Sequence, residues 1–528
     1  MSPAEPEVAR PPDASKDTLI RRRVLVGTLS NYAGRIFSFA AWFLLTPFLL
    51  RQLGATGYGL WVLVGSLVAY GWLLNFGIQG TITRYLAQHR ARGEVEQARR
   101  LLVTSLWCDA VLGMLAIALS AAIAPVVPLV FNVPPDQRAL TTWLVVLMGI
   151  GIGVTIPCET AAAALRGLHR YDLANLVTGL GTLLNVAGVL VVLLLGGGLL
   201  GVVAVSIPTT LATQALGMWL VNRVAPELRF GWRGADRRLV GTIIGFSWPL
   251  LLTHTASLLQ RKTDEIVIAA FLPVSAVTPY ALARRLSDLG RELTKQFLGV
   301  ILPVASELDA ERDTARLSSL YVAGTRLALA IFLPIGCTVT VLARPILTLW
   351  VGAAYADNVH LVAMLTLAGF MMTSELVANA VLQGMARHRP ASIASFCSAL
   401  ANLALSVLLV RPLGLTGVAL GTLIPTTLEY LVVMPYAARV IGVGLAEGLT
   451  RIWLPALTPI GPMVLVLWVV QRAAEPLSLL SLVAVIGSGF AVYAAGYLGL
   501  SATRTEREIF RGFAIGTYRL AGAYLRRT

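Results

Sequence analysis

The charged side chains with the clearest potential for function lie between residues 260 and 295. Two charged segments, 260–265 and 283–295, stand on either side of a short apolar run that ends at Pro273. Alone, the pair reads as a soluble amphipathic hairpin, but long apolar runs flank it on both sides. A charge at the middle of a bilayer costs at least a few kcal/mol, so charged residues there usually face an internal cavity and mark function.

The second charged segment has helical spacing. Four of its residues follow i, i+4, i+7 and i+11 and therefore share one helix face within about 60°: Arg284, Asp288, Arg291 and Lys295. Arg285 and Glu292 form a second strip on the same helix. Arg284 and Lys295 lie about 16 Å apart along the axis. The spacing predicts a basic ladder through half the membrane, with Asp288 as a local counter-ion.

An excess of base over acid inside the spans indicates an anionic substrate. The guanidinium group presents a planar fork of donors that matches phosphate oxygens. The expected helices at 24–50, 241–271 and 277–303 contribute most of these groups. The predicted substrate-binding residues are Asn31, Arg35, Arg261, Lys262, Arg284, Arg285, Arg291 and Lys295.

The acidic residues inside the spans have two interpretations. They are candidates for proton or sodium coupling, or they are counter-ions in structural pairs, for example Arg261 with Asp264 or Glu265. Lys295 and Arg326 can also reach the interface by extending their aliphatic stems. The residues in question are Asp109, Glu159, Asp264, Asp288 and Glu375.

Composition places these charges in a membrane protein. Of the 528 residues, 56% are hydrophobic and 13% charged, against about 25% charged in soluble proteins. The net charge of +15 fits basic cytoplasmic loops better than nucleic-acid binding, for which no basic and aromatic module is present. No phosphate-binding GxxxxGK[ST] loop or clustered metal-ligand motif occurs, so we expect neither a cofactor nor a metal.

The apolar runs predict an all-α polytopic protein with about 14 spans. They fall at 24–50, 58–82, 102–124, 140–163, 173–195, 199–220, 241–271, 277–303, 320–342, 360–383, 391–410, 414–436, 453–470 and 478–500. Basic segments concentrate on one side, which places both termini in the cytoplasm. We expect a disordered tail at 1–20, lobes at 21–222 and 241–437 joined by a linker at 223–240, two further helices at 453–500, and a basic tail at 501–528.

An internal repeat supports the two lobes. At an offset of 217 residues, IPTTL at 207–211 matches IPTTL at 424–428, and Asn185 falls on Asn402. Six spans separate the copies, so the two halves have the same orientation. Parallel repeats of this kind are common in transporters, with the substrate site between them. The sequence predicts two parallel six-helix lobes around a central cavity.

Several short segments resemble bacterial oligosaccharide flippases of the polysaccharide transporter family. They are LGATGYGLW at 53–61, NFGI at 75–78, TRY at 83–85, RGLHRYD at 166–172, DEIVI at 264–268, YALAR at 280–284 and LWVG at 349–352. That family belongs to a superfamily with the lipid II flippases and the multidrug and toxin extruders. The resemblance covers residues 20 to 440.

The resemblance implies a flippase in a bacterial inner membrane rather than an enzyme. Its substrate would be an undecaprenyl-diphosphate-linked oligosaccharide, moved to the outer leaflet by alternating access for surface polysaccharide synthesis. Membrane lipids, a coupling H⁺ or Na⁺, and neighbouring glycosyltransferases or a polymerase would be its partners. The alternatives are a lipid II flippase, a cation-coupled multidrug exporter and a membrane glycosyltransferase, although the short loops leave no room for a catalytic domain.

Overall fold

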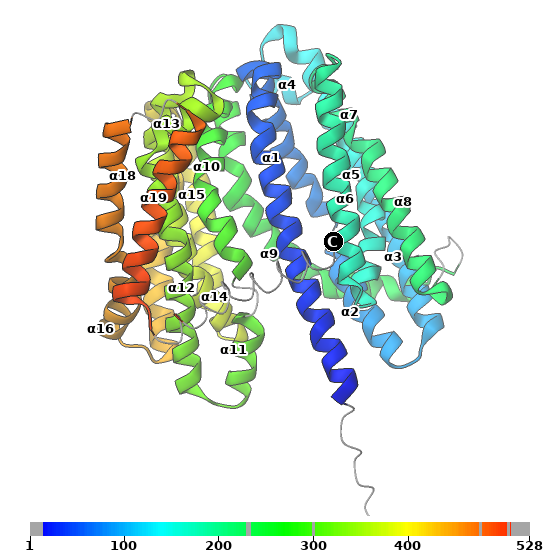
Figure 1. Ribbon diagram of the computed structural model, residues 1–528. Helices are drawn as coiled ribbons and strands as arrows, with labels where there is room; N and C mark the ends of the chain where they lie inside the picture. Colours follow the sequence, from blue (N-terminus) through cyan, green and yellow to red (C-terminus); the bar gives the residue numbers. More distant parts are fainter. Residues whose placement is uncertain are drawn as a thin grey trace, which may run out of the picture. The chain divides into compact units, whose positions relative to one another are not determined.

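A computed structural model describes residues 14–75, 77–228, 234–297, 301–474, 478–503 and 507, and these residues form helices and no strand (Figure 1). Side chains are described outside 14–39, 246–250, 252–254, 256–257, 296–297, 445 and 473–474. The predicted all-α fold is therefore confirmed. Most of the predicted tails at 1–20 and 501–528 lie outside the described residues, although helix α1 already begins at Ala14.

The helices of the first half of the chain are α1 (Ala14–Gly71), η1 (Trp72–Asn75), α2 (Ile78–Ala91), α3 (Val95–Ile123), α4 (Val127–Val130), η2 (Pro135–Gln137), α5 (Arg138–Gly167), α6 (Tyr171–Leu194), α7 (Gly198–Ala204), α8 (Ser206–Val224) and η3 (Pro226–Leu228). Those of the second half are α9 (Arg237–Phe271), η4 (Val274–Ala276), α10 (Val277–Phe297), α11 (Ile301–Ala310), α12 (Thr314–Val341), α13 (Ala343–Val351), η5 (Ala353–Asn358), α14 (Val359–Gly384), α15 (Arg389–Ile441), α16 (Leu445–Gly448), η6 (Leu449–Trp453), α17 (Leu454–Leu457), α18 (Ile460–Ala474), α19 (Leu479–Gly496) and η7 (Tyr497–Ser501).

Ten helical stretches of the described chain are long and apolar enough to cross a membrane. Two of them, 40–91 and 389–441, each contain a kinked glycine at or near the boundary between two predicted spans. Gly54 (φ 69°) and Gly414 (φ 58°) take the non-helical backbone that glycine tolerates best. The charged helix α10 is not among the ten, because its ionisable residues lower its hydropathy.

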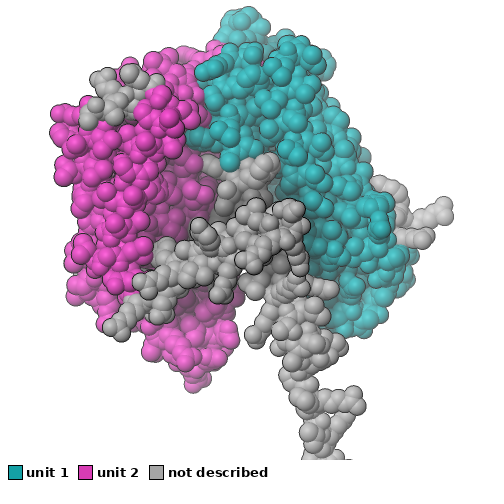
Figure 2. Space-filling model, viewed as in Figure 1, with its two compact units in different colours: residues 1–52, 67–129, 134–255 teal, residues 53–66, 130–133, 256–528 magenta. Residues whose placement is uncertain are grey.

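The chain divides into two compact units (Figure 2). Unit 1 contains residues 1–52, 67–129 and 134–255, and unit 2 contains residues 53–66, 130–133 and 256–528. The boundaries differ from the predicted lobes at three places. Residues 53–66 and 130–133 cluster with the second unit, and residues 241–255 cluster with the first. The Thr278 hydroxyl donates to the carbonyl of Ala55 at 2.6 Å, and the amide of Asn132 donates to the carbonyl of Ala269 at 3.1 Å.

Close helix packing in unit 1 depends on small residues. Helix α5 packs against α2, α3 and α8, and α6 packs against α8. At the α3–α5 contact, a Cβ on Gly113 would overlap the carbonyl oxygen of Gly153. Van der Waals packing of this kind holds helices together in lipid, where the hydrophobic effect gives no preference for contact. One repeated asparagine adds a polar tie, because Asn185 on α6 donates to Thr209 on α8 at 3.2 Å.

Unit 2 is built around α14. This helix packs against α10, α11, α12 and α15, and the buried side chains of α12, α14 and α15 form a continuous apolar core. The second repeated asparagine, Asn402 on α15, donates to the hydroxyl of Thr422 at 3.0 Å, across the Gly414 kink. Helices α18 and α19 lie side by side against α12 (Figure 1). Large apolar side chains are exposed along α3, α6, α15 and α19, as expected of helices that face lipid.

Candidate functional site

The charged residues of α9 and α10 come together within unit 2. Helix α10 is continuous from Val277 to Phe297, so the ladder predicted from the spacing lies on a single helix. Helix α9 carries Arg261, Lys262, Asp264 and Glu265. The two helices together contribute six basic and four acidic side chains between residues 261 and 295, which leaves a formal positive excess.

Asp264 is the most deeply buried member of this group. Its side chain is 0% exposed, and its Oδ2 accepts hydrogen bonds from the Tyr280 hydroxyl at 2.6 Å, from Arg284 Nη1 at 2.8 Å and from the Thr422 hydroxyl at 2.8 Å. Asn402 approaches Oδ1 at 3.5 Å. Four donors around one carboxylate satisfy its charge, so Asp264 acts as a counter-ion in this arrangement.

Arg284 pairs with Asp264 rather than facing solvent. Its side chain is 13% exposed, and Glu265 Oε2 lies 3.9 Å from the same guanidinium. The expected pair of Arg261 with Asp264 or Glu265 is therefore replaced by a pair between helices α9 and α10. The sequence could not reveal this choice, because Arg261 and Arg284 are both within reach of the acids once the helices pack.

Three other bases of the stretch form a separate group, which we call the cationic cluster: Arg261, Arg291 and Lys295. Arg261 lies close enough to Arg291 and to Lys295 for electrostatic interaction with both. Asp288 and Glu292 partly neutralise the group, since Arg291 Nη2 donates to Asp288 at 2.8 Å and Lys295 donates to Glu292 at 2.8 Å.

The cationic cluster keeps donors that the protein does not use. Arg261 is exposed and has no ion pair among the described residues. Arg291 is buried, and its Nε has no hydrogen-bond partner in the described structure, while its Nη1 meets only the weak acceptor Sδ of Met372 at 3.1 Å. Buried donors are normally paired, so the unpaired Nε of Arg291 leaves hydrogen-bonding capacity in the cationic cluster that the described protein groups do not satisfy.

Two other predicted binding residues, Lys262 and Arg285, are not part of the cationic cluster. Lys262 is half-buried beside Thr263 on α9, and Arg285 donates to the Tyr58 hydroxyl at 3.4 Å, which ties α10 to residues 53–66. The side chains of Asn31 and Arg35 lie outside the described residues. Their predicted role in substrate binding therefore stays a prediction.

A second acidic site in unit 2 joins α14 to α15. Glu375 and Glu429 are 4% and 7% exposed and lie within electrostatic interaction distance of each other. Glu429 accepts from Ser395 and from Gln260 Nε2 at 3.4 Å, whereas Glu375 Oε1 has no partner among the described groups. Glu429 is not among the residues predicted from the sequence, although an acid directly after the repeated IPTTL inside an apolar span was a usable signal.

Unit 1 contains the other two predicted acids. Asp109 on α3 is fully buried and accepts from the Thr160 hydroxyl at 2.7 Å, which links α3 to α5. Glu159 instead lines a pocket of about 280 Å³ together with Asn75 and Gln79. Asn75 Oδ1 and Gln79 Nε2 are buried without a partner in the described part of unit 1. Asp109 is therefore arranged as a helix-pairing residue, and Glu159 as a pocket residue.

We expect the Glu375–Glu429 pair to carry any coupling ion, because two buried carboxylates so close together cannot both stay charged without a proton or a cation. In Glu429→Gln, the change in transport rate with pH or with Na⁺ should be about tenfold smaller than in the wild type. Transport rates across pH 6–8, with and without Na⁺, measure this. The control is Asp357→Asn, an exposed acid in a pair with Arg344. An unchanged ion dependence in Glu429→Gln would contradict the assignment.

Comparisons with known proteins agree with this architecture. Residues 48–360 match a family model described as polysaccharide biosynthesis protein. The uncharacterized membrane protein EpsK of Bacillus subtilis (strain 168) is 21% identical over 405 residues, which cover 75% of this chain and 80% of that protein.

Solved structures show the same fold. An inward-facing multidrug resistance MATE family transporter of the MOP superfamily matches with a TM-score of 0.69 and 17% identity, covering 79% of this chain and 94% of that one. The lipid II flippase MurJ in an inward closed conformation matches with a TM-score of 0.68 and 11% identity, covering 89% and 98%. A MOP superfamily transporter from Pyrococcus furiosus Vc1 (DSM3638) matches with a TM-score of 0.59 and 16% identity, covering 79% and 95%.

Proposed function

Because the chain belongs to the polysaccharide biosynthesis protein family, we propose that it is a flippase for a lipid-linked oligosaccharide with an anionic diphosphate headgroup. The lipid carrier would be undecaprenyl diphosphate, and the direction would be from the inner to the outer leaflet. The observation that carries this proposal is the cationic cluster of unit 2, with its unpaired Arg291 Nε and its exposed Arg261.

The chemistry of the cluster favours a diphosphate. Arg261 and Arg291 offer planar forks of donors, and Lys295 adds a point charge that can follow a moving headgroup. The nearby acids, Asp288 and Glu292, leave their partners when a stronger anion arrives, because both are partly exposed to water. A diphosphate therefore finds charge-assisted hydrogen bonds without any need to break the buried Asp264–Arg284 pair.

In the proposed transport cycle, the cationic cluster holds the headgroup and the Asp264–Arg284 pair stays intact. The polyprenyl tail stays in lipid, so only the headgroup needs a polar path. Release on the far side requires a second conformational state in which the cluster binds the headgroup less tightly. Protonation or cation binding at Glu375 and Glu429, in the same unit, would bias that equilibrium. We expect alternating access of this kind.

A multidrug exporter is the second candidate, since a MATE family transporter has the same fold. The positive excess at α9 and α10 disfavours it, because substrates of that class are often cations. The choice between an oligosaccharide carrier and lipid II depends on the sugar, for which the described residues offer no selective contact.

The test is transport by the purified protein in liposomes. We expect translocation of a fluorescent undecaprenyl-diphosphate-linked oligosaccharide, scored by protection from a membrane-impermeant quencher, at a rate several-fold above protein-free liposomes. Ethidium, a lipophilic cation, should not move in the same vesicles. Export of ethidium without movement of the lipid-linked sugar would reverse the assignment.

A further inference from the structure

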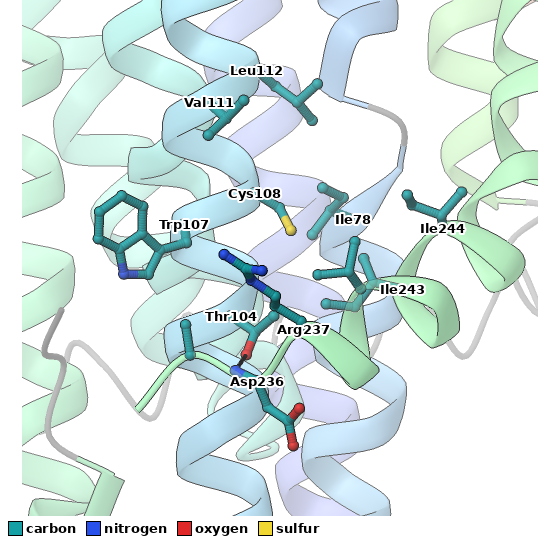
Figure 3. Close-up of a pocket in the computed structure, with 12 residues that line it drawn as sticks. Ile78, Thr104, Trp107, Cys108, Val111, Leu112, Asp236, Arg237, Ile243 and Ile244 are labelled. Carbon is teal, nitrogen blue, oxygen red and sulfur yellow. Dashed lines mark hydrogen bonds between the residues drawn. The ribbon is translucent and has the colours of Figure 1, made fainter. Parts of the chain in front are cut away.

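Unit 1 contains an apolar pocket of about 410 Å³ that the proposed function does not use (Figure 3). Most of the side chains that line it are apolar. The residues that line it come from α2, α3 and the beginning of α9: Ile78, Thr104, Trp107, Cys108, Val111, Leu112, Ala235, Asp236, Arg237, Val240, Ile243 and Ile244. The volume lies at the small end of the range for ligand pockets.

Hydrogen bonds hold the rim of the pocket in place. The amide of Asp236 donates to the Thr104 hydroxyl at 3.0 Å, and that hydroxyl donates to the carbonyl of Arg100 at 2.7 Å. Asp236 also starts α9, since its Oδ1 accepts from the amide of Arg238 at 2.9 Å. These hydrogen bonds connect the start of α9 to α3, so contacts within unit 1 maintain the shape of the pocket.

Arg237 is the one basic side chain in this lining. Figure 3 shows it extending along the pocket toward Trp107 and Cys108. No ion pair or hydrogen bond of its guanidinium is found within the described part of the chain, and the residue is exposed. A cation beside an apolar pocket is complementary to a ligand with an anionic head and an apolar chain.

The surroundings identify the source of that ligand. Trp107, Val111 and Ile244 are 42%, 52% and 50% exposed, so the pocket opens on a surface of the kind that contacts lipid chains. The volume suits one hydrocarbon chain, and the mostly apolar lining offers few hydrogen-bonding partners to a glycan. We propose that the pocket holds one acyl chain of an anionic phospholipid, and that the lipid phosphate pairs with Arg237. This site is independent of the proposed transport substrate.

The headgroup, not the chain, should provide the selectivity. An acyl chain gains little on leaving the bilayer for the pocket, because lipid tails are as apolar as the pocket wall. A phosphate with a net negative charge gains an ion pair with Arg237, and one basic residue near a lipid surface corresponds to a preference of about fivefold. Anionic and zwitterionic lipids of equal chain length therefore separate the two contributions.

The experiment uses the full-length protein in nanodiscs that contain phosphatidylglycerol or phosphatidylcholine with a diazirine in one acyl chain. After illumination, mass spectrometry locates the cross-linked peptides. We expect adducts on residues 104–112 and 240–244, about fivefold more abundant with phosphatidylglycerol. Val240→Trp fills the pocket and should remove these adducts with both lipids, whereas Arg237→Gln should lower the phosphatidylglycerol signal to the phosphatidylcholine level.

Arg238→Gln is the matched control, because Arg238 is the next residue but does not line the pocket. It should keep the preference for phosphatidylglycerol. Adducts spread evenly along the lipid-facing helices, equal labelling by both lipids, or an unchanged pattern in Arg237→Gln would each overturn the proposal. So would displacement of the label by equimolar undecaprenyl phosphate but not by unlabelled phosphatidylglycerol, since the occupant would then be a prenyl chain.

Discussion

Asp264→Ala is expected to destabilise the protein by about 3–5 kcal/mol, because it leaves a buried cation without its partner. The Arg284 guanidinium is 13% exposed and loses its 2.8 Å partner, and the hydroxyls of Tyr280 and Thr422 lose their common acceptor. These groups come from α9, α10 and α15, so the loss affects the core of unit 2. Thermal unfolding of the purified protein in detergent measures the effect.

Two companion variants make this prediction specific. Asp288→Ala removes a carboxylate that is 32% exposed from Arg291, and a partly solvated pair contributes only about 0–1 kcal/mol. The double variant Asp264→Ala/Arg284→Met removes both charges of the buried pair and should recover part of the lost stability. If Asp264→Ala and Asp288→Ala unfold at the same temperature, the Asp264–Arg284 pair does not support the unit.

The same pair changes the choice of residues for a functional test. From the spacing alone, Arg284 and Arg291 are equivalent members of one ladder, and a change at either should stop transport while folding is intact. In the structure, Arg284 supports the packing of α9 against α10, so its loss would lower stability and transport together. Arg261 is exposed and therefore reports on function alone.

The fold could be predicted because it depends on local properties of the chain. Long apolar runs and the repeated IPTTL and asparagine positions require no knowledge of tertiary contacts. The ladder on α10 follows in the same way from helical spacing. Gly54 and Gly414 have non-helical backbone angles, so the long helices α1 and α15 each consist of two helices that meet at a kink, close to where the hydropathy pattern separates two spans.

The pairing within the site could not be predicted, because it depends on contacts between distant segments. Thr422 reaches Asp264 across 158 residues of sequence. Glu429 meets Glu375 only after α14 and α15 pack against each other. Tyr280 and Asn402 both donate toward Asp264, a contact that neither the YALAR segment nor the internal repeat predicts. Spacing identifies which residues share a helix face, whereas tertiary packing decides which charges remain free.

Arg261→Gln is expected to slow translocation of the lipid-linked oligosaccharide by about tenfold or more. A hydrogen bond to a charged group contributes about 1.5–3 kcal/mol, and about 1.4 kcal/mol corresponds to a factor of ten. Because Arg261 is exposed and has no ion pair within the described chain, the unfolding temperature should not change. Arg291→Lys keeps the charge but removes the planar fork, so it should show an intermediate loss.

Arg90→Gln provides the matched control. Arg90 is an exposed base near the end of α2, in unit 1 and outside the cationic cluster, and it carries the same formal charge. Its removal lowers the net charge of the protein by the same amount as Arg261→Gln. A general electrostatic effect on lipid association would therefore slow both variants alike, whereas binding of the headgroup at the cluster slows only Arg261→Gln.

The decisive measurement is the translocation rate of an undecaprenyl-diphosphate-linked oligosaccharide in liposomes that contain equal amounts of wild-type protein, Arg261→Gln or Arg90→Gln. If the cationic cluster of unit 2 holds the diphosphate, Arg261→Gln loses about tenfold or more of the rate, while Arg90→Gln matches the wild type. Equal rates for all three proteins, with the lipid-linked substrate moving at the wild-type rate, would contradict a headgroup site at α9 and α10.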